Sequence, residues 1–282
     1  MIFEMHYPAM PLAQYVDCLW YSDQQISYAH EKILPTGTLE LIINFGGHFR
    51  LYDSDALTSS TLQTDSWLVG LQTAPLRNQP LSNTHMIAVR FKPGGAYPFF
   101  PQAAGDMHNQ VVPLDLLWGS FAAELRERLY LTRHTAARFA LLERLLLARL
   151  KPAHREVEKD IVALTVSALC RTHGNLPIRL LSEQFGISQK HLAALFRRKV
   201  GLTPKTLARV YRFQHVLQLI DPHQSINWST VALGAHYYDQ AHFNHDFATF
   251  TGMTPAAYVQ RRHAVFGATM QQGDGVHFVP TG

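Results

Sequence analysis

Two short segments near the end of the chain carry side chains that can hydrogen-bond to DNA bases or phosphates. In the later segment Gln240, Asn244 and His245 recur at the spacing of one helix face. Gln and Asn amides can pair with both hydrogen-bonding groups on the major-groove edge of adenine. In the earlier segment Arg197 and Arg198 supply cations that phosphates bind. The residues predicted to contact a nucleic acid are Gln189, Lys190, Ala193, Ala194, Arg197, Arg198, Gln240, Ala241, Asn244 and His245.

The two segments are copies of one pattern, with the constant offset of 51 residues that separates His191 from His242. Two equivalent elements at constant separation suit a ligand that itself repeats, and duplex DNA is such a ligand. The other matched pairs are Phe196 and Phe247, Gly201 and Gly252, Thr203 and Thr254, and Pro204 and Pro255.

The elements that must position these side chains are capped helices. Ser188 and Asp239 are favourable N-caps, because their side-chain oxygens accept hydrogen bonds from the unpaired N–H groups of a first helical turn. Gly201 and Gly252 predict the helix ends. A short amphipathic stretch and a tight turn precede each cap, and together they predict a helix-turn-helix whose second helix enters the major groove. The two predicted units are residues 178–201 and 228–252.

Residues 157–262 resemble the DNA-binding domain of the AraC/XylS family of bacterial transcription regulators. The resemblance is carried by LLSEQFGISQKHLAALFRRKVGLTPKTLARVYRFQHVL and VALGAHYYDQAHFNHDFATFTGMTP. It implies that a helix over 204–220 holds the two recognition helices about one DNA turn, roughly 34 Å, apart. Upstream, ILPTGTLELIINF and VRFKPGGAYPFF resemble a sensor domain found ahead of this module.

The chain departs from the family pattern at several positions. Relatives usually carry longer polar side chains at Ala193 and Ala194, and arginine at His245. We therefore expect sharper base discrimination by the second recognition helix than by the first. The usual glycine of the second turn is replaced by His236, which is strained if the backbone there needs a positive φ.

The charge is divided unevenly along the chain. Residues 1–150 carry 11 Lys and Arg against 13 Asp and Glu, whereas residues 151–282 carry 14 against 8. A basic C-terminal half favours a phosphate-binding surface, although a net charge of +6 is also ordinary for a soluble domain. Ten of the 16 histidines lie in this half, so we expect DNA affinity to rise as the pH falls toward ~6.

These patterns predict an α+β protein of two domains, each with its own core. A β-rich domain, cupin-like by the resemblance, is expected over 1–112, and a helical connector over 113–151. An all-α DNA-binding domain follows over 152–263, and a flexible tail over 264–282. The runs LELIINF and HFRLYD, on either side of Gly46-Gly47, predict a hairpin. The leucine-rich helix 134–150 is either a dimer seam or packs on its own domain.

Other sequence features exclude several classes of site. Cys18 and Cys170 lack the spacing of a disulfide framework or a zinc site, and His30, His48 and His85 form no recognised ligand motif. Arg90 could bind an acidic effector, but a salt-bridged strand residue is favoured. No apolar run reaches the roughly 18 residues of a membrane span, and the first residues lack a secretion signal. We expect a cytoplasmic protein with no cofactor, metal or catalytic residue.

The resulting prediction is a sequence-specific regulator of transcription, for instance an activator, that binds a double-stranded DNA operator. Its N-terminal domain would bind a small effector or, alternatively, dock a protein. RNA polymerase is an expected partner of an activator, and a homodimer is an open alternative. A DNA-repair alkyltransferase carrying the same module is disfavoured, because such enzymes need a reactive thiolate and cluster several cysteines.

Overall fold

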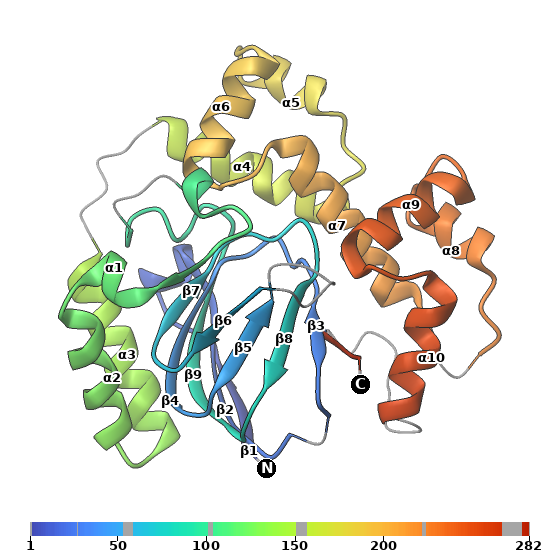
Figure 1. The fold of residues 1–282 in the computed structure, drawn as a ribbon. Coiled ribbons are helices and arrows are strands. Elements are labelled where there is room, and N and C mark those ends of the chain that lie inside the picture. The colour runs from blue at the N-terminus through green and yellow to red at the C-terminus, as the bar shows by residue number, and fades with distance from the viewer. Residues whose placement is uncertain are drawn as a thin grey trace.

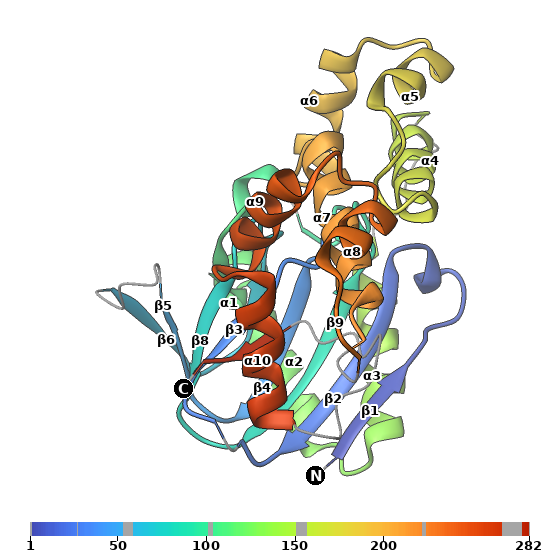
Figure 2. The same ribbon diagram turned by 90° about the vertical axis from the view of Figure 1, so that its right-hand side faces the viewer.

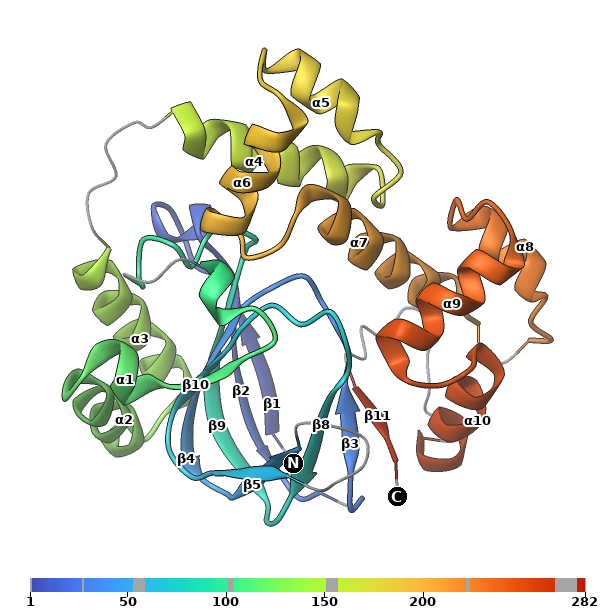
Figure 3. The same ribbon diagram turned by 45° about the horizontal axis from the view of Figure 1, so that its top comes forward.

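In the computed structural model, residues 2–26, 28–52, 59–100, 104–150, 157–221, 224–266 and 278–281 are described. The N-terminal half forms two antiparallel sheets (Figure 1). The first contains, in spatial order, β1 (Ile2–His6), β2 (Val16–Gln24), β9 (Thr84–Phe91), β4 (Glu40–Gly46), β7 (Trp67–Val69) and β10 (Val111–Pro113), with β1 at its outer edge (Figure 2). The second contains β11 (Phe278–Pro280), β3 (Glu31–Ile33), β8 (Leu76–Pro80), β5 (Phe49–Tyr52) and β6 (Ser60–Gln63). The two sheets face each other (Figure 3), so the prediction of a β-rich domain is confirmed.

Side-chain alternation along β4 gives the first sheet two buried faces. Leu41 and Ile43 belong to the main core, whereas Ile42 packs in a separate cluster with Trp67 and Ala88. Successive strand residues point to opposite faces, so each face meets a different layer. The main-core face is covered by α1 (Leu114–Trp118), α2 (Phe121–Leu131) and α3 (Thr135–Arg149). Single 3₁₀ turns, η1 (Leu12–Gln14) and η2 (Ala104–Met107), complete this half.

The predicted hairpin around Gly46-Gly47 is wrong. Strand β4 pairs with β9 and β7, and β5 pairs with β6 and β8 in the other sheet. Both sides of β4 are therefore already occupied, and the two glycines carry the chain from one sheet to the other. Gly47 has a φ of 131°, and a Cβ there would lie 2.7 Å from the Asn83 carbonyl oxygen. Glycine is needed for that close passage.

Helix α3 packs against its own domain. Phe139, Leu142, Leu145 and Leu146 are all buried in the core that the helix shares with the first sheet. Arg149 lies over the ring of Trp118, 4.5 Å from its centroid. The side of this helix that could have formed a coiled-coil seam is therefore occupied within the monomer.

Within the described residues, the C-terminal domain contains seven helices. They are α4 (Val157–Arg171), α5 (Ile178–Gln184), α6 (Gln189–Lys199), α7 (Pro204–Leu219), α8 (Trp228–Gly234), α9 (Gln240–Thr251) and α10 (Pro255–Phe266). Helices α5 and α6 form the first helix-turn-helix unit and α8 and α9 the second, with α7 between them (Figure 1). The expected all-α domain is confirmed. Within the described ranges, every helix is too short or too polar to span a bilayer.

The expectation of two separate cores is wrong. Residues of the first helix-turn-helix unit, including Leu192, Leu195 and Phe196, belong to the same hydrophobic cluster as the first sheet. The second unit has its own cluster around Phe213, yet that cluster includes Leu34 from the N-terminal half. Each helix-turn-helix unit is therefore packed against the N-terminal half.

Part of the expected flexible tail is a strand. Phe278–Pro280 form β11, which pairs antiparallel with β3, and Val279 is fully buried in the cluster of the second unit. Residues 264–266 complete α10, whereas 267–277 and 282 lie outside the described residues. This strand could not be predicted from the sequence, because it has only three residues. It forms by pairing with β3, which is far away in the sequence.

Candidate nucleic-acid interface

The two recognition helices begin at the predicted caps. The Ser188 Oγ accepts a hydrogen bond from the His191 N–H at 3.1 Å, and the Asp239 Oδ1 accepts one from the His242 N–H at 2.7 Å. Each cap satisfies one of the N–H groups left unpaired in the first helical turn. The cap side chains are therefore engaged with their own helices.

The predicted contact residues lie on the solvent side of α6 and α9. Nine of them are exposed, and Ala193 is half-buried. The opposite sides of the same helices are buried, through Leu192, Leu195 and Phe196 in α6 and Phe243, Phe247 and Phe250 in α9. The phenylalanines are thus core residues, and the polar or small side chains are available to a ligand.

Both turns use the same backbone geometry with different residues. Gly186 has a φ of 65° and His236 a φ of 60°. The next N–H closes each turn onto the preceding helix, from Ile187 to the Ser182 carbonyl and from Tyr237 to the Ala232 carbonyl. The positive φ considered at His236 from the sequence is therefore present, and a histidine occupies a conformation that favours glycine.

The second turn is one residue longer than the first. Ile187 is followed directly by the cap Ser188, whereas Tyr237 and Asp239 are separated by Tyr238. Tyr237 is buried, and its ring meets that of Phe243 edge-on at 5.6 Å. Tyr238 is 93% exposed, immediately before α9. The two tyrosines therefore have different roles, one in packing and one at the surface.

Gln240 is oriented by a neighbour on α8. The Ser229 hydroxyl donates to the Gln240 Oε1 at 3.1 Å. That oxygen keeps a second lone pair, and the amide keeps both N–H donors, so the group can still form a bidentate pair with a base. Ser229 lies at the N-terminus of α8, where Asn227 accepts hydrogen bonds from the Ser229 and Thr230 N–H groups.

An ion pair that the sequence analysis did not identify fixes α9 to the linker helix. Arg209 on α7 donates to the Asp246 Oδ1 through Nη2 at 2.6 Å, and the Asp246 side chain is only 2% exposed. Hydrogen bonding and the charge of Asp246 raise the pKa of Arg209 above its usual range. The available signal was an acidic residue directly before the core residue Phe247, on the apolar side of the helix.

Helix α7 holds the two units through residues on several sides. Leu207, Val210, Phe213 and Val216 are buried. Between them they contact both hydrophobic clusters. Gln214 also donates a hydrogen bond to the Pro35 carbonyl at 2.6 Å, so the linker is attached to the N-terminal domain as well.

The N-terminal domain also approaches the end of the first recognition helix. A Cβ on Gly105 would lie 2.7 Å from the Arg197 carbonyl oxygen, and one on Gly201 would lie 2.8 Å from the Ala104 carbonyl oxygen. Lys199 is buried, with its Nζ 5.2 Å from the centroid of the Tyr97 ring. These contacts involve the C-terminal end of α6 and leave Gln189 and Lys190 at its start exposed.

In the N-terminal half, the residue considered for effector binding is already in an ion pair, and the histidines considered for metal binding do not form a cluster. The Arg90 Nε donates to Glu40 Oε1 at 2.6 Å across neighbouring strands, as favoured from the sequence. His85 packs edge-on to Tyr21 and Phe45, and His48 is exposed. Among the described residues, no three His, Cys, Asp or Glu side chains are grouped so that they could hold a metal ion.

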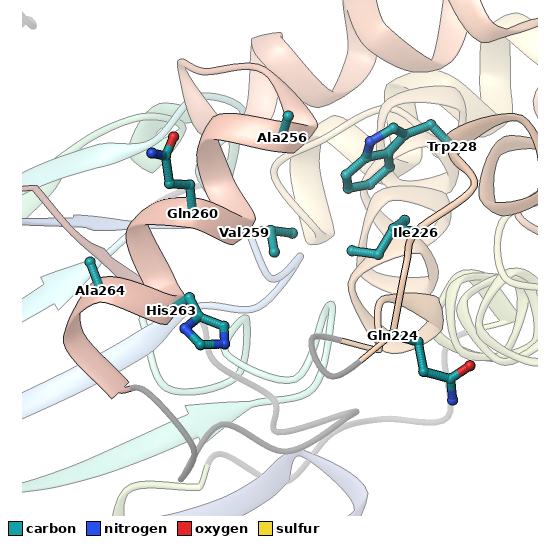
Figure 4. A pocket seen from close by; sticks show the side chains of 8 residues that line it. All are labelled: Gln224, Ile226, Trp228, Ala256, Val259, Gln260, His263 and Ala264. Atoms are coloured by element: carbon teal, nitrogen blue, oxygen red, sulfur yellow. The ribbon is translucent and has the colours of Figure 1, made fainter.

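A shallow groove of about 580 Å³ lies beside the second helix-turn-helix unit, between the start of α8 and helix α10. Ile226, Trp228 and Val259 supply its apolar walls, and Gln260 and His263 also line it (Figure 4). None of the predicted contact residues lines the groove. It is therefore separate from the candidate interface.

Comparison with protein families matches two separate segments of the chain. Residues 181–261 match a family described as a helix-turn-helix domain. This segment is an AraC-type helix-turn-helix domain. It supports a DNA-binding regulator of transcription. Residues 4–113 match a domain of unknown function, DUF6597. No curated protein sequence matches the chain.

Solved structures with a similar arrangement are distant in sequence. ToxT from Vibrio cholerae is 11% identical with a TM-score of 0.47, over 86% of this chain and 98% of that one. The same protein bound to an unsaturated fatty acid has a TM-score of 0.44 at 11% identity, over 91% and 94% of the two chains. The AraC-like transcriptional activator CuxR is 13% identical with a TM-score of 0.28, over 74% and 84%.

Proposed function

We propose that the protein regulates transcription by placing α6 and α9 in two successive major grooves of an operator. The observation that carries the proposal is the pair of capped helices with buried apolar sides and exposed contact residues, joined by one packed linker. A recognition helix needs an exposed side and a fixed orientation. Both features occur twice in this domain.

The two helices divide the work of binding. Helix α6 ends in Arg197, Arg198 and Lys199, and its central exposed positions are alanines, which can at most contact a thymine methyl. Helix α9 presents Gln240, Asn244 and His245 instead. We infer that α6 mainly contributes phosphate contacts and that α9 supplies most of the base discrimination.

Control would come from the N-terminal domain through its contacts with the first unit and the linker. Because α6, α7 and the first sheet share one hydrophobic cluster, a ligand that altered the sheet domain would also alter the support of the first recognition helix. The ligand of the N-terminal domain would be a small effector, or alternatively a protein partner. Recruitment of RNA polymerase belongs to the activator form of this proposal.

Selection of bound sequences from random duplex DNA tests the function. The full chain should enrich a bipartite site, and Gln240→Ala should lose preference at one base pair of one half, at a cost of about 1–3 kcal/mol for the cognate operator. Ser229→Ala is the matched control, because it removes only the hydroxyl that orients the amide, and it should cost less. Enrichment of no sequence would contradict the function, whereas an equal loss on operator and scrambled DNA would contradict only the role of Gln240.

Effector control has a separate test on the full chain. A metabolite that binds only the native state stabilises it by RT ln(1 + [L]/Kd), so the midpoint of thermal unfolding rises with the logarithm of the metabolite concentration once that exceeds Kd. An effector should raise the midpoint and also change the operator affinity. A ligand that raised the midpoint while leaving the operator affinity unchanged would contradict control by that ligand.

A further inference from the structure

Strand β1 is an exposed apolar edge. It is the first strand in the order of its sheet and, among the described strands, pairs with β2 alone. Phe3 is 56% exposed, and Ile2 and Met5 are exposed as well. An edge strand offers a row of N–H and C=O groups to any further strand, and the apolar side chains on it favour such an addition. Figure 2 shows β1 at the margin of the molecule, with α3 behind it.

The other sheet edges lack this combination. Strands β10 and β11 have three residues each and end in Pro113 and Pro280, which cannot donate a ladder hydrogen bond. Strand β6, with the sequence STLQ, is mostly polar. Strand β1 has five residues and contains neither lysine, arginine nor proline. Among the described strands it is therefore the edge best suited to pair with another chain.

The sequence of β1 is complementary to itself in one register. A two-fold axis perpendicular to the sheet keeps each side chain on its own face, so it must pass through a residue position. An axis at Met5 places Glu4 opposite His6 of the second copy and Phe3 opposite Tyr7. An axis at Glu4 or at His6 would instead oppose two carboxylates or two imidazoles. A carboxylate facing an imidazole can accept a hydrogen bond from it, and aromatic pairs that face each other across strands are favourable.

Contacts already present hold the two sides of this edge in place. The His6 Nε2 donates a hydrogen bond to the Glu143 Oε1 of α3 at 2.9 Å, and the His6 ring stacks on Phe139. On the other face, the Phe3 ring lies 6.1 Å from that of Trp20. The side chains that would meet a second copy are thus backed by ordered neighbours, which lowers the entropic cost of association.

We propose that two copies of this chain associate through β1, antiparallel and centred on Met5, to give one continuous sheet across a two-fold axis. Because the side chains of helix α3 are committed to its own core, this edge supplies the dimer surface in place of the leucine-rich helix. The proposal concerns association alone and does not depend on what the helix-turn-helix units bind.

Disulfide trapping measures the register directly. In a Cys170→Ser background, which removes the exposed native thiol, Met5→Cys should form a disulfide-linked dimer under mild oxidation. Phe3→Cys alone should not, because its two copies would lie four residues apart along the strands, roughly 13 Å, beyond the reach of a disulfide. A mixture of Phe3→Cys and Tyr7→Cys chains should cross-link with each other. Strongest trapping by Glu4→Cys or His6→Cys, or trapping at none of these positions, would overturn the proposal.

Sedimentation of the full chain measures the strength of association. Phe3→Lys should raise the dimer dissociation constant about tenfold, because the two-fold axis removes both aromatic pairs at once. Leu62→Lys, an equally exposed change on the edge strand β6, should leave it unchanged. A monomeric wild-type chain, or equal effects of the two substitutions, would count against the dimer.

Discussion

The two helix-turn-helix units share one local design but differ in what surrounds them. The first unit packs into the core of the N-terminal domain. The second is built around its own aromatic cluster, in which Phe213, Phe243 and Phe247 meet. On the surface the first recognition helix is basic and the second is neutral and rich in amides. The two copies of the motif therefore differ in their exposed residues, their supports and the length of the turn, while both keep an N-cap that accepts from a backbone N–H and a left-handed residue in the turn.

The support of the second unit gives the largest expected effect. Arg209→Ala removes the close partner of the buried Asp246 carboxylate, and among the described residues it leaves the His242 imidazole as the nearest ion-pair partner, 3.9 Å away. Breaking a buried pair in this way costs about 3–5 kcal/mol. Thermal unfolding should show the loss, and footprinting should show that contact fails first at the half-site read by α9.

The matched control for this change lies in the first unit. Arg179 and Glu183 form an ion pair at 2.7 Å on the surface of α5, and exposed pairs contribute about 0–1 kcal/mol. Arg179→Ala should therefore shift the unfolding midpoint far less than Arg209→Ala. Equal shifts of the unfolding midpoint in the two variants would mean that burial does not make the Arg209–Asp246 pair more stabilising than the exposed Arg179–Glu183 pair.

The phosphate role of the first recognition helix predicts an effect on affinity without an effect on specificity. Arg198→Ala should weaken binding to operator and scrambled DNA alike, and should reduce the slope of log K against log salt by about 0.9, the value for one phosphate contact. Titrations at several salt concentrations measure this slope. If Arg198→Ala changed the base preference and left the slope of log K against log salt unchanged, the assignment of phosphate contacts to α6 and base contacts to α9 would be contradicted.

Exchanging the turn residues tests the shared backbone geometry. His236→Gly should stabilise the second unit by up to about 1 kcal/mol, because it removes a left-handed non-glycine residue. Gly186→His should destabilise the first unit by a similar amount. A Cβ at Gly186 meets no atom within 4 Å, so the effect reports backbone strain alone. Denaturant unfolding of both variants measures it, and shifts of the same sign would contradict this explanation.

The smallest expected effect concerns pH at the joint between the first unit and the linker. The rings of His173 and His215 stack at 3.9 Å. Burial, together with the nearby His173 and His236, lowers the pKa of His215. The native state therefore resists protonation of His215, and its stabilising contribution is complete above about pH 6.5, the usual histidine pKa, and is lost as the pH falls below that value.

The variant His215→Gln tests this joint. Between pH 7 and 5.5 its unfolding midpoint should fall less steeply than that of the unmodified chain, since one group that must be protonated on unfolding is gone. An unchanged slope would contradict the role of His215. Such a loss of stability would oppose the rise in DNA affinity expected when exposed histidines gain charge.

Local sequence signals predicted the elements that local forces build. Ser188 and Asp239 predicted the starts of the two helices, because an N-cap accepts a hydrogen bond from a backbone N–H only three residues further along. The positive φ of His236 was also foreseeable, because this residue lies in the tight turn before a helix. The prediction of a hairpin at Gly46-Gly47 was wrong, because strand pairing depends on which strands lie beside one another in the folded sheet and not on the turn alone. Residues 278–280 are too few to show a pattern, so β11 could not be found in this way.

The sequence by itself determined the two recognition helices, their caps, their exposed residues and the β-rich character of the first half, because period and capping chemistry are written within a few neighbouring residues. Only the tertiary structure decided that the first unit shares a core with the N-terminal domain, that Arg209 reaches Asp246, and that β1 is left at an open edge. These outcomes depend on contacts between residues far apart in the chain, where packing and electrostatics act through space and leave no periodic signal in the sequence.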